Sequence, residues 1–262
     1  MPSTTPSLPP ASEWKAEHAR FTLIYAQSEP NLQKKREVLQ TITSKEPFEQ
    51  VFRHGTYTEG GEWHGGTLRI ASLTGRMDFV YNPNEKVESG SATVKANVRE
   101  MASFSKVFDP LQEAMQKWLE VDEGPVQRLA FGATIFLPVN DRLEGYQKIA
   151  GYLRDLKIDA ENSRDLLYRI NRPRTVNIDG DLFFVNRLST WSVGIRRAFT
   201  FTVSTSGANP MGSTPSESML MIEMDLSTDA NREGLFKAEE SNELLKIFVG
   251  LAVEICENGD VP

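Results

Sequence analysis

Apolar residues alternate with polar ones in several segments of the chain, and this two-residue repeat predicts β-strands with one buried side. In the first part of the chain we expect strands at 21–25, 67–73 and 77–81, the last two joined as a hairpin. In the second part, 126–137 and 218–228 have the same character. One side of the last strand is apolar, and the other carries Met221, Glu223, Asp225 and Ser227.

Four further segments are predicted helices, from a helical repeat of apolar positions or from a capping signal. The first covers 32–42. The second covers 109–119, with its first residue as the cap and proline at the first helical position. The third follows the capping box Asp141-x-x-Glu144. The last has the most regular apolar stripe and is predicted to stop at Asn258-Gly259.

The order of these elements predicts an α+β protein with two β-rich halves, each a mainly antiparallel sheet covered by amphipathic helices. The boundary is placed at Gly124-Pro125, where a helical run ends and a strand begins. The expected organisation is a disordered leader at 1–12, an N-terminal half at 13–124 and a C-terminal half at 125–262. A polar loop is expected at 206–218.

The composition is that of an acidic globular protein, and it limits the functional classes. The formal net charge of −7 and the sequence pI near 5.2 argue against general coating of nucleic acid or of anionic membranes. The single cysteine, Cys256, excludes an internal disulfide and favours a cytoplasmic location. No apolar run is long enough for a membrane helix, and residues 1–12 lack the apolar region of a signal peptide.

A positive segment interrupts this acidic chain between Arg164 and Arg197. It contains seven arginines, no lysine and three acidic residues, so its net charge is +4 and the remainder of the chain carries −11. A guanidinium group is planar, weakly hydrated and suited to defined contacts with carboxylates or phosphates. The arginine bias therefore favours contacts of defined geometry over diffuse attraction to a polyanion.

The dipeptide Asp179-Gly180 lies between two alternating runs and predicts a two-residue β-hairpin. Counting outward from this turn places arginines and aromatic residues on one side of the sheet. The expected facing pairs on that side are Ile178 with Asp181, Val176 with Phe183, Arg174 with Val185, Arg172 with Arg187, Ile170 with Ser189, and Tyr168 with Trp191. A second turn at Val193-Gly194 would bring Arg196 beside Trp191.

The charged and aromatic residues on this side form the predicted binding surface: Tyr168, Arg172, Arg174, Arg187, Trp191 and Arg196. Arginines that face each other repel, so the surface requires a counter-charge. One interpretation is internal, with Glu223 and Asp225 of a neighbouring strand supplying it. The other is external, with the surface binding a phosphate-containing ligand, single-stranded nucleic acid or an acidic partner protein.

Other candidate chemistry finds little support in the sequence. His54 and His64 flank two acidic residues, but their spacing matches no common zinc site. Cys256 lies on the apolar stripe of the last helix, which indicates a core residue. No nucleotide-binding, phosphate-binding or hydrolase motif occurs. We therefore predict no catalytic residue, no metal site and no cofactor.

Four stretches carry a family resemblance: Val126–Gly132, Tyr168–Arg174, Asn186–Ser192 and Glu254–Asp260. In these stretches, mainly in its second half, the chain resembles a sporadically distributed family of uncharacterised bacterial proteins. The resemblance implies a bacterial source and an intact domain, and it brings no catalytic residue or ligand that could be transferred.

These observations predict a non-catalytic binding or assembly protein of a bacterial multi-component system, which engages a partner protein through the arginine and aromatic surface. The alternative is a nucleic-acid-binding module that uses the same surface, and a third hypothesis is an enzyme of unknown reaction. The sequence leaves the oligomeric state and the identity of any partner open.

Overall fold

The computed structural model describes residues 8–26, 37–83, 101–196, 199–204, 207–213 and 217–262, with the backbone alone for 199–204 and 207–213. Along these residues the strands are β1 (Lys15–Tyr25), β2 (Glu49–Arg53), β3 (Thr56–Trp63), β4 (Gly66–Leu73), β5 (Arg76–Asn82), β6 (Ala102–Ser103), β7 (Val126–Val139), β8 (Leu167–Asn171), β9 (Arg174–Ile178), β10 (Asp181–Arg196), β11 (Phe199–Ser204), β12 (Gly207–Ser213) and β13 (Glu217–Thr228). The helices are the short 3-10 helix η1 (Ala11–Glu13) and the α-helices α1 (Val38–Thr43), α2 (Phe104–Leu119), α3 (Arg142–Tyr152) and α4 (Ala238–Asn258).

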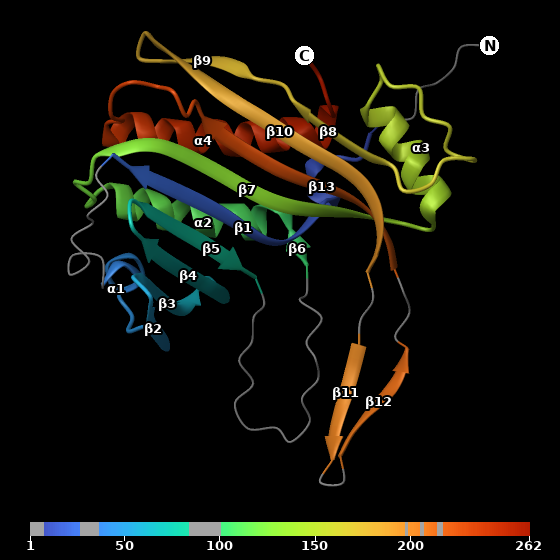
Figure 1. Ribbon diagram of the computed structural model, residues 1–262, viewed down its shortest axis with the longest axis horizontal. Coiled ribbons are helices and arrows are strands. Elements are labelled where there is room, and N and C mark those ends of the chain that lie inside the picture. The colour runs from blue at the N-terminus through green and yellow to red at the C-terminus, as the bar shows by residue number, and fades with distance from the viewer. Residues whose placement is uncertain (1–7, 27–36, 84–100, 197–198, 205–206, 214–216) are drawn as a thin grey trace.

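Eleven strands form one antiparallel sheet in the order β2-β3-β4-β5-β1-β7-β13-β10-β8, with β6 paired to β1 and β9 paired to β10. The α+β class with a mainly antiparallel sheet is therefore confirmed. Both predicted halves contribute to this sheet, because β1 pairs with β7 from Lys15 opposite Phe136 to Tyr25 opposite Val126. Strands β11 and β12 pair with each other and project from the ends of β10 and β13 (Figure 1).

The helices lie on one side of the sheet. In Figure 1, α2 and α4 run behind the central strands, α1 lies beside β3 and β4, and α3 lies against the ends of β13 and β10. We call this side the covered face. We call the opposite side of the same strands the open face, because no helix of the described residues lies on it.

The alternation along the strands explains the two faces. On each central strand, every second residue is apolar and buried against the helices. Examples from β1, β7, β13, α2 and α4, all at most 1% exposed, are Phe21, Leu23, Phe131, Ile135, Leu220, Ile222, Leu111, Met115, Leu244 and Phe248. Their burial is the main favourable contribution to the fold, and it leaves the intervening polar residues on the open face.

Helix α2 begins earlier than predicted, at Phe104, so Pro110 lies inside it instead of at its first position. Phe104, Val107 and Phe108 are buried and extend the apolar stripe towards the N-terminus. Each buried side chain of this size contributes about 1.5–3 kcal/mol, whereas a proline inside a helix costs about 3 kcal/mol. The additional burial therefore outweighs the proline.

Strand β10 also differs from the prediction. It continues to Arg196 and is paired with β13 from Val185 to Arg196, so the turn expected at Val193-Gly194 is absent and Arg196 does not approach Trp191. The expected polar loop at 206–218 contains β12 and the start of β13. Pairing with the long strand β13 satisfies the backbone of β10, which a turn at a single glycine would have interrupted.

The N-terminal part was predicted less completely. Strands β2 and β3 were not expected, and of the helix predicted at 32–42 only the residues from 37 onward are described, with α1 beginning at Val38. Of the leader predicted at 1–12, residues 8–12 are described, and Leu8 and Ala11 pack against the core. Residues 1–7 lie outside the described part of the chain.

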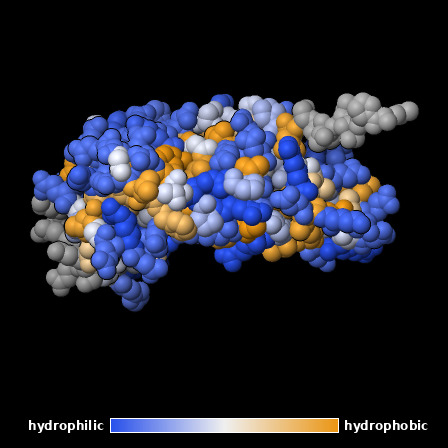
Figure 2. Space-filling view, turned by 90° about the horizontal axis from the view of Figure 1, so that it is seen from above, coloured by the Kyte–Doolittle hydropathy of each residue, from blue (hydrophilic) through white to orange (hydrophobic). Residues whose placement is uncertain are grey.

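Among the described residues, no helix is long and apolar enough to cross a membrane. Seen from above the view of Figure 1, the surface is mainly hydrophilic, with apolar residues in small separate groups (Figure 2).

Candidate functional site

The register predicted for the arginine hairpin is confirmed. Asp179 and Gly180 both have positive φ angles, 51° and 95°, as a two-residue hairpin turn requires. The observed pairs run from Ile178 opposite Asp181 to Tyr168 opposite Trp191, as counted from the turn. The N–H group of Arg172 donates to the carbonyl oxygen of Arg187 at 3.0 Å.

Arg172, Arg174 and Arg187 point to the covered face and contact the last turns of α4 and the residues that follow it. The guanidinium group of Arg172 binds the carboxylate of Asp260 through two bonds, Nε to Oδ1 at 2.9 Å and Nη2 to Oδ2 at 3.1 Å. The Tyr168 hydroxyl donates to Oδ2 of the same carboxylate at 3.4 Å. Asp260 therefore holds two of the six predicted residues, and its hydrogen bonds raise the pKa of Arg172.

Arg174 and Arg187 continue this arrangement. Nη2 of Arg174 donates to the carbonyl oxygen of Val261 at 2.8 Å and lies 3.4 Å from Oε1 of Glu254. Nη2 of Arg187 donates to the carbonyl oxygen of Gly259 at 3.1 Å, and its Nε lies 3.7 Å from Oε2 of Glu254. The side chain of Arg187 is only 1% exposed, and this burial lowers the pKa of its guanidinium group.

We call Arg172, Arg174 and Arg187 the arginine cluster. Three guanidinium groups face the two carboxylates of Glu254 and Asp260, and the carbonyl oxygens of Gly259 and Val261 accept further hydrogen bonds. The Nε of Arg187 is buried without a hydrogen bond, 3.7 Å from Glu254. The cluster thus has its counter-charge inside the chain.

A glycine allows the chain to reach the arginine cluster after α4. Gly259 has a φ of 77°, and a side chain there would overlap the backbone carbonyl of Tyr152. Only glycine combines this conformation with this close approach. The end of α4 is therefore fixed at the position from which Asp260 and Val261 contact the arginines.

The other two predicted residues are separate from the cluster. Trp191 is fully buried, its indole N–H donates to the Ser189 hydroxyl at 3.0 Å, and its ring lies 5.3 Å from that of Tyr152. Arg196, at the far end of β10, forms an ion pair with Glu17 at 3.3 Å. The structure thus brings together Tyr168 and the three arginines of the cluster, and it places Trp191 in the core and Arg196 elsewhere.

The internal counter-charge comes from Glu254 and Asp260, and not from Glu223 and Asp225 as hypothesised. On β13 the two hypothesised acids alternate with Leu220, Ile222, Met224 and Leu226, which face the helices, so the acids face the opposite way.

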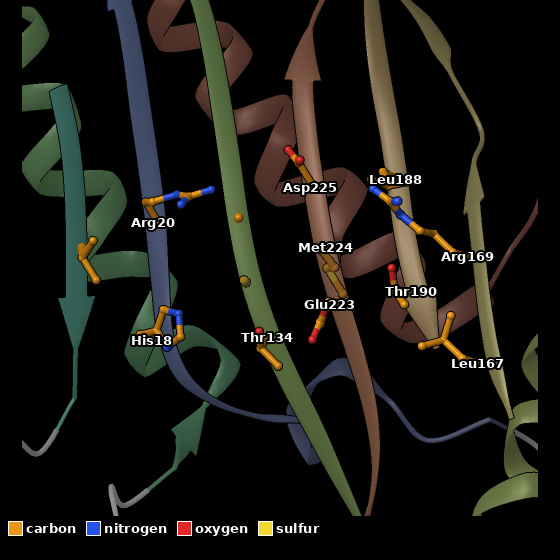
Figure 3. Close-up of a pocket in the computed structure, with 13 residues that line it drawn as sticks. His18, Arg20, Thr134, Leu167, Arg169, Leu188, Thr190, Glu223, Met224 and Asp225 are labelled. Atoms are coloured by element: carbon orange, nitrogen blue, oxygen red, sulfur yellow. The ribbon is translucent and has the colours of Figure 1, made fainter. Parts of the chain in front are cut away.

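On the open face, Glu223 and Asp225 line a shallow hollow of about 600 Å³ whose lining residues come from six strands, β5, β1, β7, β13, β10 and β8 (Figure 3). Arg20 extends from β1 towards β7, and Arg169 extends from β8 towards β10 on the other side of β13. Other labelled residues on this face are His18, Thr134, Leu167, Leu188 and Thr190. We call this region the open-face hollow.

The strand register arranges the open-face hollow in two rows that run across the strands. In one row, Arg20 lies opposite Gly132, which lies opposite Asp225. In the other row, Glu223 lies opposite Thr190, which lies opposite Arg169. One small residue therefore separates each arginine from an acid.

Four of these charged side chains, Arg20, Arg169, Glu223 and Asp225, form no ion pair and no side-chain hydrogen bond within the described part of the chain. The Nε of Arg20 is itself buried without a hydrogen-bond partner. The open-face hollow and the arginine cluster thus differ, since within the described residues the arginines of the cluster face carboxylates in ion pairs and those of the hollow do not.

Sequence reasoning did not identify Arg20 and Arg169 as site residues. The one indication of this site in the sequence was the alternation in 218–228, which places Glu223 and Asp225 on the side of the strand that faces away from the core. No pattern in the neighbouring sequence indicated that β1 and β8 would each lie two strands away from β13 in the sheet.

The histidine and cysteine residues show no site of their own. His64 lies in the turn between β3 and β4, and its Nε2 is 2.9 Å from a carboxylate oxygen of Glu113. Cys256 is buried, which raises the pKa of its thiol. Among the residues that the structure describes, no group of three histidine, cysteine or acidic side chains could hold a metal ion.

Comparison with known proteins gives no family. No protein-family model matches the chain, and no curated protein sequence matches it. The resemblance noted in the sequence therefore stays a prediction, and the functional argument depends on the molecule itself.

Proposed function

We propose that this chain is a non-catalytic binding protein of a bacterial multi-component system, and that it binds a partner protein through the open face of its sheet. The observation that carries the proposal is the open-face hollow, in which charges of both signs have no partner among the residues that the structure describes. Charged side chains that remain unpaired on an uncovered sheet are available for contacts with another molecule.

Apolar residues on the same face favour a protein as the partner. Leu167, at the rim of the hollow, is 67% exposed. Leu182 and Phe184 of β10 are 71% and 46% exposed, and they face away from the helices because Phe183 and Val185 between and beside them are buried. Exposed apolar residues next to arginines are typical of protein interfaces.

The geometry gives the nucleic-acid alternative less support. The arginine cluster, on which that alternative depended, is held by Glu254 and Asp260. In the open-face hollow, two acids lie between the arginines, and a polyanion would have to approach both of them.

The proposal is tested by tagged capture from cells of the organism that encodes the protein, followed by binding measurements with the purified partner. The variant Arg20→Glu/Arg169→Glu reverses the charge at both ends of the hollow. The matched control, Arg154→Glu/Lys157→Glu, changes the net charge equally at exposed residues outside the hollow. We expect the open-face variant to bind at least about tenfold more weakly, as for loss of a few charged contacts, and the control to bind like the wild type. Equal binding by the two variants and the wild type would refute the proposal.

A further inference from the structure

The two edges of the sheet differ in how well they could accept a further strand. At one edge, β8 and β9 are separated by Arg172 and Pro173. Proline has no N–H group, and a break in the strand interrupts the row of backbone groups, so this edge is poorly suited to pairing. At the other edge, β2 contains no proline, and no described strand pairs with its outer side (Figure 1).

The backbone of β2 directs hydrogen-bonding groups to this outer side. β2 and β3 are joined by the two-residue turn His54-Gly55, with φ angles of 48° and 79°, and Arg53 lies opposite Thr56. The pair next to such a turn exchanges both of its hydrogen bonds, and bonded pairs alternate with unbonded ones along the strands. Gln50 and Phe52 therefore point their N–H and C=O groups away from β3. An extended segment of another molecule can pair with these groups.

A cavity of about 580 Å³ lies on the covered side of the same edge. Gln50 and Phe52 line it together with Glu59 and Tyr57, which lie opposite them on β3. Glu59 identifies the side, because its carboxylate accepts a hydrogen bond from the N–H of Leu39 in α1 at 2.6 Å. A strand added next to β2 would direct every second side chain to this side of the sheet. Those side chains would lie beside the cavity.

The lining of the cavity favours a cation. Its carboxylates are Glu37, Glu46 and Glu59, and no basic side chain among the described residues lines it. None of the three forms an ion pair within the described part of the chain, and burial together with the charge of Glu37 raises the pKa of Glu59. Phe52, which is 57% exposed, adds an aromatic ring. Carboxylates beside an aromatic ring suit the charged end and the apolar stem of lysine or arginine.

We infer that the outer edge of β2 binds an extended basic segment of a partner protein. The segment adds a strand to the sheet, and its lysine or arginine side chains on the covered side enter the acidic cavity. A second copy of this chain fits less well, because pairing of two β2 strands would bring two acidic cavities together. None of the residues involved belongs to the open-face hollow, so the inference is independent of the proposed function.

The test uses three synthetic peptides of about nine residues, a usual strand length, in which threonine alternates with a charged residue. The first carries lysine at the charged positions, and the second carries glutamate. The third is the lysine peptide with its lysine N–H groups methylated, so that these groups cannot donate to β2. Binding is followed at low salt by NMR shift changes of the full-length protein, which detect weak complexes.

We expect the lysine peptide to shift the amide signals of β2 and to bind at least about fivefold more tightly than the other two peptides. Glu37→Gln/Glu46→Gln should weaken its binding about fivefold, as loss of two surface ion pairs would. The matched control, Glu161→Gln/Glu239→Gln, changes the net charge equally at exposed residues outside the cavity and should bind like the wild type.

The variant Gln50→Pro removes one N–H group from the outer side of β2 and should also weaken binding of the lysine peptide. If that variant does not fold, the methylated peptide tests the same hydrogen bonds on the unaltered protein. Dimers of the wild type in analytical ultracentrifugation that are lost in Gln50→Pro would assign the edge to a second copy instead.

Four results of the peptide experiment would overturn the inference. They are no shift change in β2, equal binding of the lysine and methylated peptides, equal binding by the two double glutamine variants, and shift changes that free lysine reproduces. The last result would indicate a small cationic ligand. The proposed function is judged separately, because Arg20→Glu/Arg169→Glu and its control Arg154→Glu/Lys157→Glu should bind the lysine peptide equally.

Discussion

Arginines on the two faces of the sheet differ in their contacts, although they lie on the same or neighbouring strands. Arg169 and Arg172 are three positions apart in the β8 region, and β10 carries Arg187 on its covered side. Arg172 and Arg187 are held by the residues after α4, with Asp260 and the carbonyl of Gly259 at 2.9 and 3.1 Å. Arg169 points to the open face and has no partner among the described residues.

Solvent accounts for this difference. A guanidinium group on the covered face loses its hydration, so the fold requires a carboxylate or a carbonyl oxygen within hydrogen-bond distance. Arg169 on the open face is exposed, so its guanidinium group is hydrated and needs none. The position of a charge in the strand repeat therefore decides whether it serves the fold or is available to another molecule.

The largest change in stability is expected on substitution of Arg187. The substitution Arg187→Ala removes a side chain that is 1% exposed and leaves Glu254 and the carbonyl of Gly259 with fewer donors. We expect the free energy of unfolding to fall by about 3–5 kcal/mol, as for breaking a buried ion pair. Urea unfolding followed by circular dichroism measures this loss.

Arg187→Met serves as its control, because methionine keeps most of the volume and adds no unpaired charge. It should lose less stability than Arg187→Ala. A loss below about 1 kcal/mol for both variants would mean that the covered face does not depend on this counter-charge.

The sequence predicted those parts of the fold that depend on neighbouring residues. The Asp179-Gly180 turn fixed the hairpin register, and Asp141 caps α3 by accepting from the N–H of Glu144. The stop of α4 at Gly259 was also local information. The pairing of β1 with β7 was not predictable, because it joins strands about a hundred residues apart.

The candidate site was predicted in part. The requirement for a counter-charge followed from Arg172 facing Arg187, but its source was placed on the wrong strand. The arginines share their side with Phe183 and Val185, which are core residues. Acids that reach this side must come from the helical layer, as Glu254 and Asp260 do, and a tertiary contact of this kind leaves no pattern in the sequence.

A buried acid in the N-terminal part is expected to have a smaller effect on stability, which also comes from the burial of a charged group. Glu59 of β3 is 1% exposed, and its Oε1 accepts a hydrogen bond from the N–H of Leu39 at 2.6 Å. Burial raises the pKa of Glu59 above its ordinary value of 4.5. The folded protein therefore holds this proton more tightly than the unfolded chain does.

The sign of the pH dependence follows from this shift. The contribution of Glu59 to stability is complete below pH 4.5 and is lost as the pH rises through the raised pKa of the folded state. The free energy of unfolding of the wild type should therefore fall, relative to that of Glu59→Gln, as the pH rises above 4.5. We expect this fall to be smaller than the loss caused by Arg187→Ala. Urea unfolding at a series of pH values tests this, and a difference that stays constant or grows with pH would contradict it.

The smallest change in stability is expected for substitutions on the open face. Arg169→Ala and Glu223→Gln remove charges that are exposed and have no partner within the described residues. Each should change the free energy of unfolding by no more than about 0.5 kcal/mol, the range of surface substitutions that break no contact. Arg169→Ala is the direct counterpart of Arg187→Ala, since both remove one guanidinium group from this end of the sheet. If Arg169→Ala costs as much as Arg187→Ala in the same urea experiment, then Arg169 serves the fold, and the distinction between the two faces fails together with the binding role assigned to the open-face hollow.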